Sequence, residues 1–249
     1  MPITGILAKG PEMSTILSTK RSISPSIGDQ WTLEAGDHLT RAEFEQRYAR
    51  QPDVKKAELI EGVVYMPSPV HLNTHAAPHS LLVAWVVTYQ AATPGTVAAD
   101  NATVRLDADN QPQPDVLLYV LPECGGRVRI SEDDYLEGAP EWIGEFASST
   151  ASYDLHSKRN AYRRNQVGEY LVVLPRQAEV RWFELQADRY ELLIEQEGIL
   201  RSRRFPGLWL NVPALLAGDA AAMLDTLRAS LNSPEHAEFV SRLQNAAKH

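Results

Sequence analysis

The sequence predicts an α/β or α+β sandwich, and three observations support this. A helical segment comes first, a cluster of short strands follows, and a helix then leads to further strands, an order typical of layered α/β folds and not of a helical bundle or a barrel. Residues 116–120 form a compact apolar run of the kind buried in a mixed sheet. The 249 residues, 44% of them hydrophobic, suffice for one sizeable domain and are too few for two.

The N-terminal part divides near Trp31. Residues 1–30 are rich in Ser, Thr, Pro and Gly and carry no hydrophobic period, which predicts a flexible tail or a loosely docked arm. Thr40 and Glu43 have the spacing of a capping box, so we expect a helix over 41–50.

The middle of the chain alternates strands and helices. Residues 57–66 are predicted to form two strands that turn at Glu61-Gly62. A helix is expected within 73–92, starting or restarting at Pro78. Further strands are predicted at 96–99, 102–106, 116–120 and 142–147.

The remainder continues the alternation. A polar helix is expected over 153–166, with Gly168 just past its end. Strands follow at 169–174, 178–185 and 190–195, the last two pairing across 186–189. From Asp219 onward the chain reads as helical, with a break at Ser233-Pro234.

Composition limits the class of protein. The only cysteine, Cys124, excludes an internal disulfide framework and a cysteine-based zinc site. No secretory signal is evident, and the most apolar run, 81–87, is far shorter than the roughly 20 residues of a membrane span, so we expect a cytoplasmic protein. The formal net charge of −8 opposes tight binding to DNA, which usually needs a basic surface. Any contact with DNA must therefore use a local basic face or bound divalent ions.

Two acidic residues stand on predicted strands. Asp115 lies at the mouth of the 116–120 strand, and Glu145 lies inside an apolar strand. An acid in that setting is costly to bury unless it is paired or bound to metal. If the two strands are neighbours, both carboxylates can hold a hard cation, and Mg²⁺ needs only one or two protein carboxylates.

The helix after Glu145 carries the complementary charges. Lys158 could reach back over the strand end to orient water or to stabilise a phosphate. Asp154 and Tyr162 lie one turn before and one turn after it on the same face. Three further residues make this helix the best local candidate for a phosphate-facing surface: Arg159, Arg163 and Arg164.

Each of these residues also has a simpler structural interpretation. Asp115 can close a turn, Glu145 can pair with an arginine such as Arg181, and Asp154 with Lys158 is most often a solvent-exposed ion pair.

Other chemistries are less well supported. The spacing of His71, His75 and His79 could align them on one helix face, but Pro78 interrupts it and no Glu accompanies it as in H-E-x-x-H. His75 alone is a better candidate for a supporting role. No serine-nucleophile elbow, phosphate-binding loop or dinucleotide fingerprint occurs, and nothing near Cys124 would activate its thiol.

The order of motifs resembles a known family. The similarity spans roughly residues 38–200 and rests on Glu58-Leu59-Ile60-Glu61-Gly62, His75, Pro114-Asp115-Val116, Glu145 followed by Ser149-Thr150, then Asp154, Lys158 and Tyr162, and Gly168-Glu169-Tyr170-Leu171-Val172-Val173. The sequence is thereby similar to the Uma family of restriction-endonuclease-like proteins, a branch of the PD-(D/E)xK nuclease superfamily.

The resemblance implies a restriction-endonuclease-like core, in which a central mixed β-sheet is flanked by helices and the active site lies at one sheet edge. It implies that Asp115 and Glu145 bind Mg²⁺ or Mn²⁺, with Glu58 as an auxiliary acid. The superfamily's lysine usually lies two residues after the acid, where this chain has Ala147; Lys158 matches the lysine that the family places on the next helix. Residues 201–249 resemble a C-terminal extension that packs on the 31–200 domain or helps to form a homodimer.

Three functions follow as alternatives. The first is a metal-dependent endonuclease that hydrolyses DNA phosphodiester bonds with an activated water; there His75, Asp154, Arg159 and Tyr162 would bind substrate. The second is a catalytically silent nuclease fold that acts as a binding or dimerisation module, favoured if Lys158 points away from Asp115 and Glu145. The third is a hydrolase of a smaller phosphoester, favoured if the site is too closed for a duplex.

Overall fold

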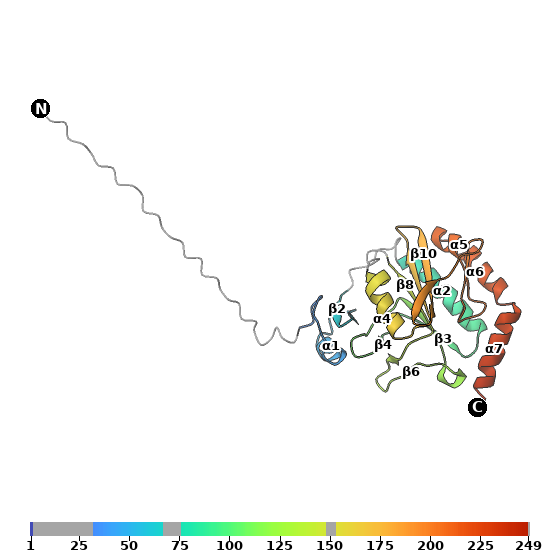
Figure 1. The fold of residues 1–249 in the computed structure, drawn as a ribbon, viewed down its shortest axis with the longest axis horizontal. Coiled ribbons are helices and arrows are strands. Elements are labelled where there is room, and N and C mark those ends of the chain that lie inside the picture. Colours follow the sequence, from blue (N-terminus) through green and yellow to red (C-terminus); the bar gives the residue numbers. More distant parts are fainter. Residues whose placement is uncertain (2–31, 67–75, 148–152, 249) are drawn as a thin grey trace. The chain divides into compact units, whose positions relative to one another are not determined.

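A six-stranded sheet is the centre of the computed structural model, which describes residues 1, 32–66, 76–147 and 153–248 (Figure 1). Across the sheet the strands are β11 (Arg189–Leu192), β10 (Glu179–Gln186), β9 (Glu169–Leu174), β8 (Trp142–Phe146), β5 (Val116–Val120) and β3 (Thr96–Asp100). The pair β8–β9 is parallel and the other pairs are antiparallel, so the predicted mixed sheet is confirmed.

One face of the sheet is covered by helices from two distant parts of the chain (Figure 1). These elements are α2 (Ala77–Ala92), α5 (Val212–Ala217), α6 (Ala220–Ser230) and α7 (Pro234–Ala246), together with the hairpin of β12 (Ile199–Arg201) and β13 (Trp209–Asn211). Trp85 of α2 makes edge contacts with Trp142 and Trp182, with ring centroids 5.9 and 6.0 Å apart. The C-terminal residues thus share one apolar core with the sheet.

The other face carries α4 (Arg159–Arg164) and a small three-stranded sheet. The small sheet consists of β4 (Val104–Arg105), β7 (Leu136–Glu137) and β6 (Arg129–Ile130), in that order. Alternate residues of a strand point to opposite faces; accordingly Leu117 and Ile143 pack on this side, whereas Val116 and Trp142 pack on the α2 side. This alternation decides which face receives each acidic side chain.

A third, smaller core lies beside the sheet and positions the first strand. It joins α1 (Arg41–Tyr48) to the hairpin of β1 (Glu58–Ile60) and β2 (Val63–Tyr65). The predicted capping box is present, since Thr40 N donates to Glu43 Oε2 at 3.0 Å and Glu43 N donates to Thr40 Oγ1 at 3.4 Å. The turn between β1 and β2 falls on Glu61-Gly62 as expected, with φ of 54° and 73°.

Several local expectations are corrected. The helix expected over 153–166 opens with a π-helical turn, η4 (Asp154–Lys158), before α4. Its end is marked by Gln166 in the left-handed region (φ 65°) and not by Gly168. Gly168 has a different role, because a Cβ there would lie 2.8 Å from the carbonyl oxygen of Glu141.

The remaining differences lie in short elements. The strands expected at 102–106 and 190–195 are shortened to β4 and β11. The elements that the sequence analysis did not predict are the 3₁₀ turn η3 (Pro122–Cys124), β6, β7, β12, β13 and α5. The predicted tail beyond residue 1, His71, His75 and Ser149-Thr150 lie outside the described residues. Of the helices described, none is long and apolar enough to cross a membrane.

Candidate active site

Asp115 and Glu145 meet because their strands are neighbours. Val116 pairs with Gly144 in the β5–β8 ladder, which sets Asp115 opposite Glu145, and the alternation places both side chains on the α4 face. Asp115 N donates to Glu145 Oε2 at 3.4 Å, and Phe146 N donates to Asp115 Oδ2 at 2.8 Å. The two acids are thus interlocked through backbone groups at one end of the sheet.

Lys158 completes the cluster. Its Nζ lies 2.8 Å from Glu145 Oε1 and 3.0 Å from Glu58 Oε1, and 3.8 Å from Asp154 Oδ1. All of these side chains are buried, and the lysine is only 3% exposed. The exposed-pair interpretation of Asp154 and Lys158 is therefore wrong.

The π-helical turn and the β1–β2 hairpin bring the remaining charges together. Asp154 and Lys158 are the first and last residues of η4, and π turns occur frequently at functional sites. Glu58 arrives from β1, which is joined to the 111–113 segment by the Leu59–Gln111 bridge. Its Oε1 also accepts a hydrogen bond from Gln113 N at 2.7 Å. Three separate stretches of sequence thus converge on one ammonium.

Burial and mutual repulsion set the protonation of the cluster. Burial raises the pKa of Glu145 to about 8; Lys158 opposes this shift, whereas the neighbouring carboxylates of Asp115, Asp154 and Glu58 add to it. Burial acts to lower the pKa of Lys158, but the surrounding carboxylates outweigh it and hold that pKa well above its usual value. The lysine therefore stays charged at neutral pH.

Tyr162 belongs to the same cluster, whereas Arg159 does not. The Tyr162 hydroxyl donates to Glu145 Oε1 at 2.9 Å, and burial followed by the charge of Glu145 keeps the pKa of this phenol well above its usual value. The guanidinium of Arg159 lies 5.3 Å from the ring of Phe183, on the outer side of α4. Arg181, the alternative partner for Glu145, pairs with Glu179 instead, at 2.7 Å.

Three neighbours of the cluster were not predicted to lie beside it. Lys56 Nζ lies 3.8 Å from Asp115 Oδ1; its spacing of two from Glu58 was an available signal, because alternate residues of an extended chain share a side. His79 Nε2 lies 3.0 Å from the Asp115 carbonyl oxygen and 3.1 Å from an oxygen of Asp100.

Tyr153, the third, has no comparable sequence signal. Its ring lies 4.0 Å from that of Tyr65 and 5.4 Å from the Lys158 ammonium. Among the described residues its buried hydroxyl has no hydrogen-bond partner. Such a group is uncommon, because an unsatisfied buried donor costs about 1–3 kcal/mol.

The donor atoms fit a hard divalent cation. Glu145 Oε1 receives two short hydrogen bonds, whereas Oε2 receives the long one from Asp115 N. The proximity of Asp115 also raises the pKa of Glu145, so a cation between the two carboxylates would relieve their repulsion. Within the described part of the chain no three His, Cys, Asp or Glu side chains converge as a ready metal site. Two carboxylates nevertheless suffice for Mg²⁺, which keeps several waters.

The fold and the buried acidic cluster define a class: a nuclease-like fold with an Asp, a Glu and a Lys at the end of its central sheet. The family model Uma2, described as "Putative restriction endonuclease", matches residues 41–213. The chain therefore belongs to the Uma2 family, and the resemblance found in its motifs is confirmed.

A solved structure has the same fold. It is described as "a putative nuclease belonging to DUF820 from Anabaena variabilis ATCC 29413", with a TM-score of 0.51 and 17% identity, and the match covers 69% of this chain and 96% of that one. At this identity the likeness shows the fold. No curated protein matches the chain.

Proposed function

We propose that this protein is a metal-dependent endonuclease that hydrolyses DNA phosphodiester bonds with an activated water. The observation that carries the proposal is the Lys158 ammonium, 2.8 Å from Glu145 in a buried position beside Asp115. A lysine from the helix thus pairs with Glu145 even though the strand position for it is occupied by Ala147, buried in the α4-side core.

The residues of the cluster have separable tasks. Lys158 has three N–H donors. Two of them lie at hydrogen-bond distance from Glu145 and Glu58, whereas Asp154 is farther from the ammonium, at 3.8 Å. The third donor can therefore be shared with an attacking water or a phosphate oxygen. Tyr162 holds Glu145 Oε1 by donating to it, and Glu58, itself fixed by Gln113 N, holds the Lys158 ammonium.

The metal would be held by Asp115 and Glu145. When bound there, Mg²⁺ or Mn²⁺ would lower the pKa of a water and neutralise charge on the phosphate. On the protein side, Phe146 N fixes the Asp115 carboxylate and Asp115 N contacts that of Glu145, so both acids are oriented by the sheet itself.

Plasmid cleavage tests the proposal. We expect the wild-type protein to nick and linearise supercoiled DNA with Mg²⁺ or Mn²⁺ and not with EDTA, and Asp115→Ala to slow cleavage by about 10²–10³-fold, the cost of removing one electrostatic group from an active site. Asp225→Ala is the matched control, because that aspartate is exposed on α6 and should leave cleavage unchanged. Failure of the wild type on supercoiled, linear and single-stranded DNA would refute the proposal.

A hydrolase of a smaller phosphoester is the second candidate, and burial favours it. Asp115 is 6% exposed and Glu145 is 3% exposed, so a duplex can reach them only if the site opens. Hydrolysis of bis-p-nitrophenyl phosphate without nicking of a plasmid would select this candidate. A catalytically silent module is less favoured, because the Lys158 ammonium points toward Glu145, 2.8 Å away.

A further inference from the structure

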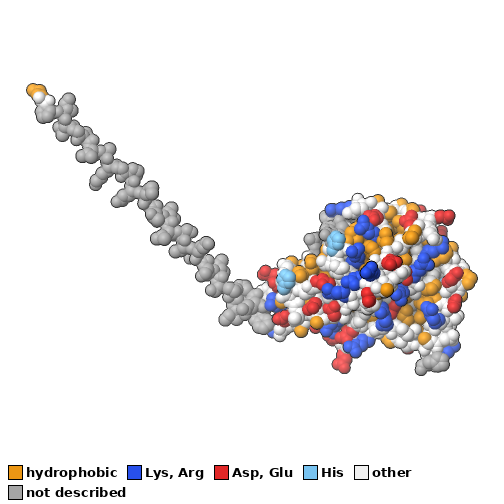
Figure 2. All heavy atoms as spheres, in the orientation of Figure 1, with side chains coloured by type: hydrophobic (Ala, Val, Ile, Leu, Met, Phe, Trp, Pro, Cys, Tyr) orange, Lys and Arg blue, Asp and Glu red, His pale blue; other side chains and the backbone are white. Residues whose placement is uncertain are grey.

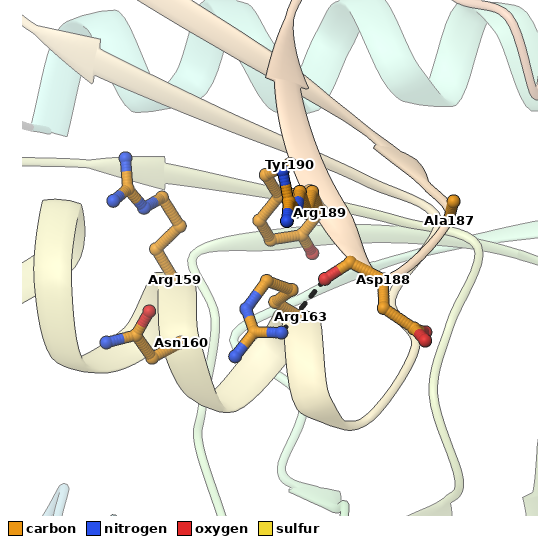
Figure 3. Close-up of a pocket in the computed structure, with 7 residues that line it drawn as sticks. All are labelled: Arg159, Asn160, Arg163, Ala187, Asp188, Arg189 and Tyr190. Atoms are coloured by element: carbon orange, nitrogen blue, oxygen red, sulfur yellow. Dashed lines mark hydrogen bonds between the residues drawn. The ribbon is translucent and has the colours of Figure 1, made fainter.

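A second polar site lies on the outer side of α4, away from the acidic cluster. It is a pocket of about 580 Å³ between α4 and the β10–β11 hairpin (Figure 3), lined by Arg159, Asn160, Arg163, Ala187, Asp188, Arg189 and Tyr190. Two of its arginines come from the helix and the third from β11. The sequence indicated only the helical ones, because Arg189 is brought beside them by the sheet.

The guanidinium groups of this pocket are not neutralised. Within the described residues no carboxylate forms an ion pair with Arg159, Arg163 or Arg189, whereas Arg105, for example, is paired with Glu45 and with Asp133, both at 2.7 Å. Three uncompensated arginines in one pocket are notable in a chain of net charge −8. On the face shown in Figure 2, basic and acidic side chains are interspersed, so a surface that attracts anions has to be local.

The one acid in the pocket is turned away from it. Asp188 Oδ1 accepts a hydrogen bond from Gln166 Nε2 at 3.0 Å, and in Figure 3 its carboxylate points away from the three guanidinium groups. Its carbonyl oxygen faces inward instead and accepts from Arg163 Nη1 at 2.9 Å. The hairpin therefore offers a backbone carbonyl oxygen to Arg163, while the Asp188 carboxylate is held outside the pocket by Gln166.

The wall formed by the hairpin is fixed. Ala187 and Asp188 have φ of 44° and 66°, the left-handed conformations of a tight hairpin turn that usually requires Asn or Gly. The bonds to Arg163 and Gln166 hold this turn, and Tyr190 donates from its hydroxyl to the Val167 carbonyl oxygen at 3.0 Å. An arginine pocket with a preformed wall loses little entropy on binding an anion.

We propose that this pocket binds backbone phosphates of the nucleic-acid strand whose scissile bond lies at Glu145 and Lys158. The inference rests on the proposed function. Arg159 directly follows Lys158 in sequence, and Arg163 lies four residues further, about 6 Å along the helix. A strand leaving the acidic cluster along α4 would therefore meet these guanidinium groups in turn. Arginine matches phosphate through paired N–H donors.

Binding measured without cleavage tests this. Fluorescence anisotropy of a labelled 20-base-pair duplex would be followed in EDTA between 50 and 300 mM salt. The parent protein carries Asp115→Asn. The two pocket variants add to it either Arg189→Ala alone or Arg159→Ala together with Arg189→Ala. Counterion release predicts a slope of log K against log salt that is smaller by about 0.9 per lost phosphate contact. At 0.1 M salt this corresponds to roughly 8-fold weaker binding for one contact and 60-fold for two.

Arg176→Ala is the control of equal charge. Arg176 is exposed in the turn between β9 and β10, at the opposite end of β10 from the pocket, roughly 25 Å away. Its loss should leave the affinity and the slope unchanged. Equal binding by the pocket variants and their parent, weakening by Arg176→Ala to the same degree, or no binding of the duplex by the parent would each overturn the inference. Pocket-dependent binding without cleavage by the wild type would refute the endonuclease and leave the pocket standing.

Discussion

Replacement of Lys158 by methionine removes the ammonium from the acidic cluster while keeping most of the side-chain volume. The carboxylates of Glu145, Glu58 and Asp154 lie 2.8, 3.0 and 3.8 Å from the Lys158 ammonium. Without the ammonium they would face one another in a buried site. Breaking a buried ion pair by removing one partner costs about 3–5 kcal/mol. For a folded unit of this size 1 kcal/mol shifts the melting temperature by about 2–4 °C. We therefore expect Lys158→Met to melt roughly 6–20 °C below the wild type.

The stability deficit of Lys158→Met relative to the wild type should grow as the pH rises. The folded pKa of Glu145, about 8, lies above its ordinary value of 4.5, so between these values the folded state keeps a proton that the unfolded state has released, and stability falls as pH rises through this window. Lys158 lowers the pKa of Glu145, so this pKa rises further in Lys158→Met. The variant therefore continues to lose stability at pH values where the wild type no longer does. Lys158 itself, with a raised folded pKa, supplies stability that is fully present below its ordinary value of 10.5.

Thermal melts at pH 6 and pH 9, followed by circular dichroism, measure both effects. Lys55→Met is the matched control, because Lys55 is exposed and such substitutions usually change stability by less than about 0.5 kcal/mol. A melting temperature equal to that of Lys55→Met, or a deficit that shrinks from pH 6 to pH 9, would refute the reasoning.

Three further substitutions test other parts of the structure. Glu169→Ala removes the acceptor of four hydrogen bonds, two from the buried Trp182 and Ser202 and two from the partly buried backbone N–H groups of Arg203 and Arg204. It should cost about 3 kcal/mol or more; an unchanged urea midpoint would contradict this. Tyr153→Phe removes a buried hydroxyl without a partner among the described residues, so the free energy of unfolding should stay level or rise by about 1 kcal/mol, and a clear fall would indicate a hidden partner. Gly144→Ala places a Cβ 2.5 Å from the Trp142 ring and should lower stability by about 1–3 kcal/mol in thermal melts; an unchanged melting temperature would show that the ring can move.

The sequence predicted the parts of the fold that local chemistry determines. Strand β5 and residues 170–174 of β9 are continuous apolar runs, and the α1 capping box can be recognised from two residues. The short pairs β6–β7 and β12–β13 have no such signal, because they form through contacts with distant segments. The π turn is equally hidden, since its sequence has an ordinary helical spacing.

The site was predictable in its acids and less so in their partners. Asp115 and Glu145 could be identified because each is a carboxylate on an apolar strand, and strand adjacency then brings them together. Tyr153 carries no sequence pattern, and its place beside Lys158 follows from the π turn. Arg189 could not be assigned to the outer pocket, since its proximity to Arg163 depends on how the hairpin folds over α4.

The position of the lysine explains why one helix can serve both sites. A lysine two residues after Glu145 would stand at Ala147, on the same face of β8 and in contact with the α4-side core. Supplying the ammonium from η4 instead leaves that face apolar, so Tyr162 can pack there and bond to Glu145. The residue after Lys158 then emerges on the outer side of the helix, where Arg159 lies over Phe183. Because the lysine lies on the helix, two adjacent residues carry the two charges: Lys158 is buried against Glu145, and Arg159 lies on the outer side, where we propose that it binds a phosphate.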